Sequence, residues 1–287
     1  MDTPESNLPL EPGTEPLAET ALPAAPPAVP QQQFPEDLRT PWGWGDLLVF
    51  VFFGMGSLVV MAQVAAVIVL IVFQASPARL EQMPTARAAF ATLSQAMWSA
   101  VVMLYLLAVA RVRFNAPFWR SLGWRRLEVP GMSRLQAHLA CLLGGSVFAI
   151  AIQMSSALLQ PETKLPIEDL FRSREGILML MAMGILVAPL VEETIFRGFL
   201  YPVIARSWGV GPGVVVTGIL FGLMHAVQLW GGWGQISLLM IVGIVFTYVR
   251  ARTGTTLAPY LLHVGYNSIL FVAFYVGTQG LRNLPGS

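Results

Sequence analysis

Long apolar runs separated by short polar stretches make up most of the chain after its first 40 residues. Runs of transmembrane character lie at 47–73, 88–110, 135–159, 177–191, 214–229, 236–249 and 257–276. A helix needs about 20 apolar residues to cross the hydrocarbon core of a bilayer, and the fourth, fifth and sixth runs are shorter than that. The stretch 199–204 either extends the fourth run or forms a separate re-entrant or interfacial helix. The pattern predicts an all-α, polytopic transmembrane helical bundle with seven or eight membrane helices.

The composition supports this interpretation and limits the classes of binding partner that are expected. Of the 287 residues, 55% are hydrophobic and 11% are charged, whereas a soluble domain carries about 25% charged residues. The formal net charge is +1, and no basic stretch is interleaved with aromatic residues, so nucleic acid is not an expected partner. Cys141 is the single cysteine, which excludes an internal disulfide and a zinc site built from several thiolates. The chain is expected to be a multi-pass integral membrane protein in contact with membrane lipids.

The first 40 residues differ from the rest of the chain. They are rich in proline and acidic residues, and no basic residue precedes Arg39. This stretch lacks the positive n-region of a signal peptide. Because it cannot bury enough apolar area to offset the entropy lost on ordering, residues 1–40 are predicted to form a disordered tail.

A basic loop after the second apolar run predicts the orientation. Its only acidic residue is Glu128, whereas its basic residues are Arg111, Arg113, Arg120, Arg125, Arg126 and Arg134. Basic residues in short loops favour the cytoplasmic side, and Trp119 and Trp124 in the same loop suggest an amphipathic segment at headgroup level. The N-terminal tail is then cytoplasmic, and in a prokaryote the membrane is the cytoplasmic membrane.

The apolar runs and loops divide the chain into five parts. After the tail at 1–40, residues 41–134 hold the first two membrane helices and the basic loop. Residues 135–175 hold the third membrane helix and an external loop. A core at 176–278 contains the remaining membrane helices, and residues 279–287 form a C-terminal tail.

Three ionisable residues interrupt the apolar pattern of the core. Glu192, Glu193 and Arg197 lie within the sequence Leu-Val-Glu-Glu-Thr-Ile-Phe-Arg-Gly-Phe-Leu-Tyr, between two apolar runs. A charge at mid-bilayer costs about 2.5 to 3.5 kcal/mol on insertion scales, so such groups normally face the protein interior. Arg197 lies one helical turn after Glu193 and can neutralise it, which leaves Glu192 as an acid or base. The alternative is a surface ion pair at a helix end.

Two further polar pairs follow, each with a spacing of four residues. His225 follows Phe221 on one helical face, and His263 shares a face with Asn267. Taken alone, His225 could be a packing residue, and the second pair could be an interhelical hydrogen-bonding pair. Together with the carboxylates they supply a base and fixed hydrogen-bond donors, which are the parts that peptide hydrolysis needs. Gly218 and Gly222, which precede His225, form a G-x-x-x-G face for close helix packing.

The ordered set of three motifs resembles a known family signature. Its motifs are Glu192-Glu193-x-x-x-Arg197, Phe221-x-x-x-His225 and His263-x-x-x-Asn267. This order is similar to that of the CPBP intramembrane endopeptidases, also called the ABI family, which include the CAAX prenyl endopeptidases. The resemblance spans about residues 177–276 and implies an active site between helices inside the membrane.

The resemblance also implies a role for each motif residue. Glu192 would be the general base that activates water, and His225 would help to hold or deprotonate that water. His263 and Asn267 would bind the oxyanion, while Glu193 and Arg197 would support or orient these groups. The implied partner is a peptide or protein substrate, and the family's substrates include lipid-modified and membrane-anchored chains.

Members of the family are described as metal-dependent, although a metal-free mechanism is also proposed for them. If Zn²⁺ takes part, His225, His263 and Glu192 are the ligands that the chemistry suggests. The H-E-x-x-H arrangement of zincins is missing, and a metal-free glutamate-activated water is the expectation.

Two other functions compete with the endopeptidase. The first is a catalytically silent membrane scaffold or immunity protein that binds peptides. The second is a proton-coupled transporter that uses the same carboxylates and histidines as a relay. An intramembrane serine protease is not favoured, because Ser146 after Gly144 and Gly145 is typical of small-residue helix packing.

Overall fold

The computed structural model describes Met1 and residues 35–159 and 165–284, and within these ranges every regular element is a helix. The longer α-helices are α1 (Trp44–Phe73), α3 (Pro84–Ala108), α5 (Arg134–Leu158), α9 (Val210–Met224), α10 (Trp233–Thr253) and α11 (Leu257–Gly277). The shorter ones are α2 (Pro77–Glu81), α4 (Phe118–Ser121), α6 (Arg174–Ala182), α7 (Ala188–Glu193) and α8 (Tyr201–Trp208). Two 3-10 helices, η1 (Glu36–Leu38) and η3 (Pro166–Phe171), and three π-helices, η2 (Val109–Arg113), η4 (Met183–Val187) and η5 (Thr194–Leu200), complete the set. The predicted all-α class is confirmed.

Six helical rods of the described chain are long and apolar enough to cross a membrane. They span Trp44–Phe73, Pro84–Arg113, Arg134–Leu158, Arg174–Trp208, Trp233–Thr253 and Leu257–Gly277. The helix α9 is apolar too, but it has only 15 residues. The chain is therefore an integral membrane protein with several spans, although the expected count of seven or eight is not confirmed.

The fourth rod is longer than its apolar run predicted. It continues from α6 through η4, α7 and η5 to α8, so the stretch 199–204 belongs to it. Pro189 and Pro202 lie inside this rod, and a proline ring normally clashes with the carbonyl four residues before it. Those carbonyls belong to Ile185 and Gly198, which lie in the two π-helical segments. The wider π-helical turns accommodate both prolines, which allows the helix to continue past residue 191.

Local signals explain where several helices begin and end. The Ser133 hydroxyl accepts a hydrogen bond from the Gln136 backbone N–H at 3.3 Å, while the Gln136 side chain accepts one from the Ser133 N–H at 2.8 Å, which forms a capping box for α5. Gly209, with φ of 94°, separates α8 from α9, and Gly254, with φ of 66°, ends α10. Only glycine adopts these backbone angles without strain.

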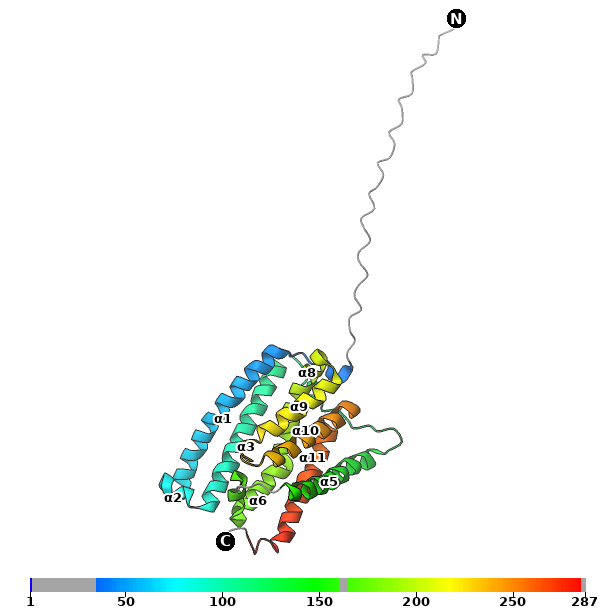
Figure 1. Cartoon of the computed structure of the whole chain (residues 1–287). Coiled ribbons are helices and arrows are strands. Elements are labelled where there is room, and N and C mark those ends of the chain that lie inside the picture. Colours follow the sequence, from blue (N-terminus) through cyan, green and yellow to red (C-terminus); the bar gives the residue numbers. More distant parts are fainter. Residues whose placement is uncertain (2–34, 160–164, 285–287) are drawn as a thin grey trace. The chain divides into compact units, whose positions relative to one another are not determined.

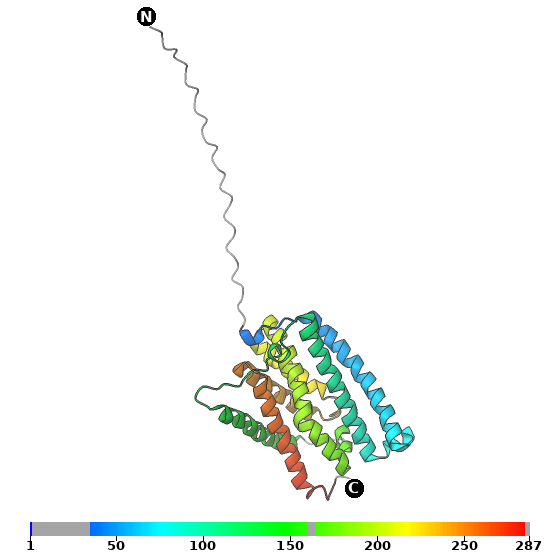
Figure 2. The same cartoon turned by 180° about the vertical axis from the view of Figure 1, so that it is seen from behind.

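Close helix packing brings the C-terminal core together (Figure 1). The helix α9 packs on α8 and α10, and α5 packs on α11, while α1 and α3 lie side by side at another edge, as both views show (Figure 2). A Cβ atom added at Gly145 or Gly265 would collide with the backbone of the opposite helix of the α5–α11 pair. Ser146 lies in this contact and donates a hydrogen bond to the Gly265 carbonyl at 3.1 Å.

The G-x-x-x-G face at Gly218 and Gly222 packs against α10. A Cβ at either position would meet the backbone of α10, and one at Gly243 of α10 would meet Gly218 in return. This contact between two helix backbones fixes α10 close to α9, and it positions the Gly243 carbonyl for use in the site described below.

The described residues include the end of the predicted N-terminal tail. Residues 2–34 lie outside the described part of the chain, but residues 35–40 are folded against the core. Leu38 is 3% exposed and packs with Tyr201, Ala205 and Val214, and Thr40 is 8% exposed. Residues 35–42, which we call the strap, therefore belong to the helical body.

Candidate active site

The three motifs meet where the fourth rod, α9, α10 and α11 pack together. Glu192 and Glu193 end α7, Arg197 lies in η5, His225 follows the last residue of α9, and His263 lies in α11. Phe221 of α9 links them, because its ring lies 5.0 Å from the His225 ring and 5.9 Å from the His263 ring. The structure brings residues far apart in the sequence into one cluster inside the bundle.

An ion pair between Glu193 and Arg197 is the most deeply buried part of the cluster. Arg197 Nη1 lies 3.1 Å from Glu193 Oε1, and both side chains are completely buried. The spacing of four residues places the two side chains on one face of the rod. Arg197 also donates to the Gly243 carbonyl at 2.9 Å and to Thr247 Oγ1 at 3.2 Å. A buried charge needs such partners, and here they come from both the rod and α10.

Aromatic rings surround the Arg197 guanidinium. Its central carbon lies 4.5 Å from the ring centroid of Phe221, 5.6 Å from that of Phe246 and 5.9 Å from that of Phe196. Rings at these distances attract a cation through their quadrupoles while they exclude water. This setting fixes Arg197 in position and leaves it little contact with solvent.

His263 lies between the two adjacent carboxylates. Its Nδ1 is 2.9 Å from Glu193 Oε1, and its Nε2 is 3.9 Å from Glu192 Oε2. An ionised carboxylate only accepts hydrogen bonds, so Nδ1 carries the hydrogen and donates to Glu193. That bond orients the imidazole so that Nε2 faces Glu192. The sequence grouped His263 with Asn267, whereas its direct partner in the structure is Glu193.

Glu192 and Glu193 differ in environment although they are neighbours in sequence. Glu193 is fully buried and is engaged by Arg197 and His263 through Oε1, while its Oε2 has no hydrogen-bond partner among the described residues. The Glu192 side chain is 12% exposed. Glu192 is therefore the carboxylate of the pair that a small molecule can approach.

His225 and Asn267 lie at the edge of the cluster. His225 Nδ1 is 2.9 Å from the Phe221 carbonyl and must donate to it, which leaves Nε2 with a free lone pair. Asn267 Nδ2 donates to the Gly184 carbonyl of the rod at 2.6 Å, which occupies one of its two amide hydrogens. In the described chain, neither side chain is bonded directly to Glu192 or His263.

The described side chains do not gather into a three-ligand metal site. No group of three or more His, Cys, Asp or Glu residues in the described ranges could hold a metal ion. Glu192 and His263 approach each other, but His225 is directed by its bond to Phe221 and does not complete a set with them. The described residues therefore do not form the zinc site suggested by the sequence.

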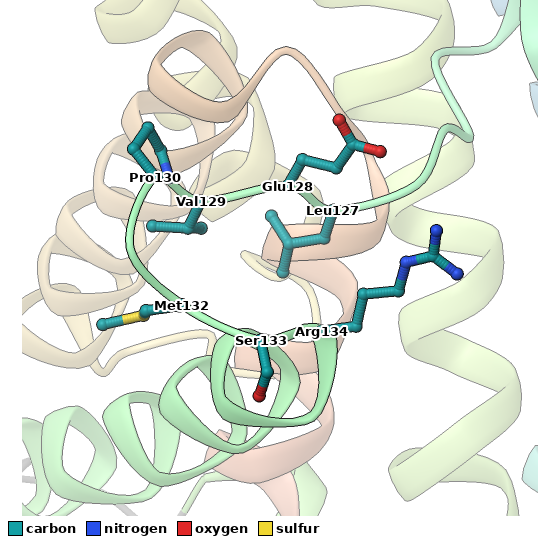
Figure 3. Close-up of a pocket in the computed structure, with 7 residues that line it drawn as sticks. All are labelled: Leu127, Glu128, Val129, Pro130, Met132, Ser133 and Arg134. Atoms are coloured by element: carbon teal, nitrogen blue, oxygen red, sulfur yellow. The ribbon is translucent and has the colours of Figure 1, made fainter.

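Two surface hollows lie away from the cluster. One, of about 660 Å³, is enclosed by the loop that leads into α5 and is lined by Leu127, Glu128, Val129, Pro130, Met132, Ser133 and Arg134 (Figure 3). The other, of about 450 Å³, is lined by Ala100, Met103, Leu104, Leu107, Phe118 and Trp119. Neither of these two hollows is lined by a motif residue.

Two residues of α10 belong to the site although no motif contains them. Gly243 and Thr247 both accept hydrogen bonds from Arg197, and Thr247 Oγ1 in turn donates to the Gly243 carbonyl at 2.7 Å. In the sequence they are a small residue and a hydroxyl residue in an apolar run, four positions apart. That spacing is common in membrane helices, so the sequence offers no signal that selects them.

Comparisons with known proteins agree with the motifs. Residues 174–269 match the family described as type II CAAX prenyl endopeptidase Rce1-like. A curated Escherichia coli protein, named as an uncharacterized 24.3 kDa protein, is 30% identical over 169 residues, which cover 57% of this chain and 73% of the relative. No solved structure matches the chain. The matched region begins with the fourth rod and ends in α11, and it contains all three motifs, so the chain belongs to the Rce1-like CAAX endopeptidase family that these motifs resemble.

Proposed function

We propose that this protein is an intramembrane endopeptidase in which Glu192 activates the attacking water. The observation that carries the proposal is the distance of 3.9 Å between Glu192 Oε2 and His263 Nε2. The other nitrogen of His263 is bonded to Glu193, which forms the buried ion pair with Arg197. A water molecule about 2.8 Å from both atoms fits across that separation. Family membership supports a protease-like enzyme, and the geometry supports this particular water.

The proposed reaction keeps the charge of the cluster balanced. With His263 as an imidazolium, the charges of Glu192, Glu193, Arg197 and His263 sum to zero, which makes the buried arrangement tolerable in a low dielectric. Glu193 holds the imidazolium through Nδ1, so the Nε2 hydrogen remains available to a ligand.

The chemical steps follow from these roles. Glu192 takes a proton from the water, and the resulting hydroxide adds to the substrate carbonyl carbon. The Nε2–H of His263 and the free amide hydrogen of Asn267 stabilise the oxyanion, and His225 holds the water or the substrate through its free Nε2. Glu192 then passes its proton to the peptide nitrogen as the carbon–nitrogen bond breaks. The products are a carboxylic acid and an amine, and no covalent enzyme intermediate forms.

The substrate class follows from the depth of the cluster. Gly243, which binds Arg197, lies about 10 Å along α10 from Arg250 at the helix end, given a rise of about 1.5 Å per residue. A peptide bond that reaches this depth belongs to a chain held at or in the membrane, such as a membrane-anchored or lipid-modified peptide.

The key experiment compares the membrane proteomes of cells that contain the wild-type protein or the Glu192→Gln variant. Amide for carboxylate keeps the shape but removes the base, so an uncut membrane-associated peptide or protein should accumulate in the variant. A base in this role contributes about 100- to 10,000-fold to the rate. Glu175→Gln, the same change at the exposed start of the fourth rod, is the matched control and should behave as the wild type does.

Two results would contradict the proposal. If no uncut protein accumulates in the Glu192→Gln cells, the endopeptidase function loses its support. If the purified protein contains stoichiometric zinc that its activity requires, the metal-free role of Glu192 is wrong. Uptake driven by a pH gradient in proteoliposomes would favour the transporter instead.

A further inference from the structure

The strap connects the same two helical elements that Arg197 connects. Arg206 of α8 donates to the carbonyls of Thr40 and Trp42 at 2.7 and 2.6 Å. Arg250 of α10 donates to the Asp37 carboxylate at 2.8 Å and to the Asp37 carbonyl at 3.0 Å. The strap thus connects the fourth rod to α10. Its contacts lie closer to the C-terminal ends of both elements than the bonds that Arg197 makes to Gly243 and Thr247.

One strap residue also reaches directly into η5. The Trp42 indole N–H donates to the Phe199 carbonyl at 3.1 Å, and the rings of these residues lie 5.1 Å apart. Trp42 is only 2% exposed. The bond therefore ends on the backbone of the π-helical segment that contains Arg197 and directly follows Glu193.

The register of η5 decides where the catalytic side chains point. A π-helical turn holds one residue more than an α-helical turn, and such segments persist only where the surrounding structure fixes them. If η5 changed from π-helical to α-helical geometry, the helix register would shift by one residue. The part of the rod after η5 would then rotate relative to the part before it by about 100°, the angle of one α-helical residue. Glu193 precedes η5, Phe199 with its bond from Trp42 lies within it, and Arg206 follows it, so the register of η5 couples the strap to the carboxylates.

We propose that the strap is a positioning element of the active site and that Trp42 is its main positioning residue. Trp42 acts through the Phe199 carbonyl, and the strap keeps the fourth rod and α10 at the separation in which Arg197 reaches Gly243, Thr247 and Glu193 together. This inference rests on the proposed endopeptidase function for its catalytic consequence, but its structural part can be tested without a substrate.

The test uses Trp42→Phe in the full-length protein in lipid nanodiscs. Phenylalanine keeps an aromatic ring beside Phe199 but removes the indole donor. Trp44→Phe is the matched control, because Trp44 also donates an indole hydrogen bond, at 2.8 Å, but to Ser207 near the end of α8 and not to η5. Amide hydrogen exchange of residues 194–200 should accelerate in Trp42→Phe by about 3- to 10-fold, the value of one net hydrogen bond, and stay unchanged in Trp44→Phe.

The catalytic consequence is measured on the substrate that the Glu192→Gln comparison identifies. For Trp42→Phe, kcat should fall by about 3- to 10-fold with KM unchanged, since the substrate is bound as before but the cluster is less often aligned. Asp37→Asn, which weakens the other end of the strap, should likewise lower kcat and leave KM unchanged. Trp44→Phe should keep the wild-type kcat.

The outcomes separate the two proposals. Equal exchange of residues 194–200 in Trp42→Phe and in the wild type would overturn the structural role of the strap, whatever the substrate is. Faster exchange with an unchanged kcat would overturn its link to catalysis. If no substrate is found, the endopeptidase function fails, while the exchange experiment still decides whether the strap holds η5.

Discussion

The cluster of motif residues and the strap each supply the carboxylate partner of one completely buried arginine, but the two carboxylates differ in exposure. Arg197 pairs with Glu193, whose side chain is 0% exposed, and Arg250 pairs with Asp37, whose side chain is 19% exposed. At the outer edge of the strap, Arg120 pairs with Glu36, whose side chain is 60% exposed. The carboxylate in the cluster cannot turn to water, whereas those in the strap can. Loss of the arginine should therefore be most harmful in the cluster.

The largest effect is expected for Arg197→Met. It removes the arginine partner of the buried Glu193 and leaves one uncompensated negative charge in the cluster, and breaking a buried pair in this way typically costs about 3 to 5 kcal/mol of unfolding free energy. The Arg197→Met, Glu193→Gln double variant removes both charges and should recover much of this loss. Thermal denaturation in one fixed detergent measures both. Equal destabilisation of the single and double variants would mean that packing, and not the unpaired charge, dominates the cluster.

A smaller effect is expected for Arg250→Met. Asp37 can rotate toward solvent once its partner is lost, so the destabilisation should lie between about 1 and 3 kcal/mol, between the values for exposed and buried pairs. Arg252→Met is the control, since Arg252 is exposed on the same helix, and surface changes of this kind stay within about 0.5 kcal/mol. If Arg250→Met is as harmful as Arg197→Met, the comparison between cluster and strap fails.

The smallest effect is a pH dependence at Glu36. Hydrogen bonding to Arg120, with the positive charges of Arg125 and Arg120, lowers the pKa of the Glu36 carboxyl from its ordinary value of 4.5. A lowered folded-state pKa means that the ionised form stabilises the fold above the ordinary value, and that this stabilisation is lost as the pH falls through the folded-state pKa. The difference in thermal midpoint between the wild type and Glu36→Gln should therefore shrink on acidification below pH 4.5. If the difference in thermal midpoint did not change with pH, the ion pair between Glu36 and Arg120 would be ruled out as its source.

The same comparison shows how much the sequence could predict. Glu193 and Arg197 are one helical turn apart, as are Phe221 and His225, and helical periodicity alone puts each pair on one face. The bond from His263 to Glu193 crosses 70 residues, and that from Arg250 to Asp37 crosses 213. Such contacts depend on how the helices pack, which a single sequence does not specify. The motif spacing therefore placed each pair on one helical face but did not predict the partner of His263.

The prolines of the fourth rod show a second limit of the sequence. Pro189 and Pro202 interrupt an apolar pattern, and proline usually ends or kinks a helix. The expected run stopped at 191, but two π-helical segments carry the helix on to Trp208. The apolar content of the region was predictable, while the register that absorbs the prolines was not. The Gly218 and Gly222 face, by contrast, packs as its pattern predicts.

The short helix α9 has a consequence for the membrane around it. Its 15 residues extend about 22 Å, whereas the hydrocarbon core is about 30 Å thick. Local thinning of the bilayer is one way to accommodate an apolar helix this short, and it would bring headgroups toward His225, which directly follows the last residue of α9. Hydrolysis consumes one water for each bond cut, and a dimple in the lipid surface beside His225 would shorten the distance over which that water must leave the aqueous phase. Under the proposed function, the hydrophobic mismatch of α9 would be a physical route by which water reaches the cluster.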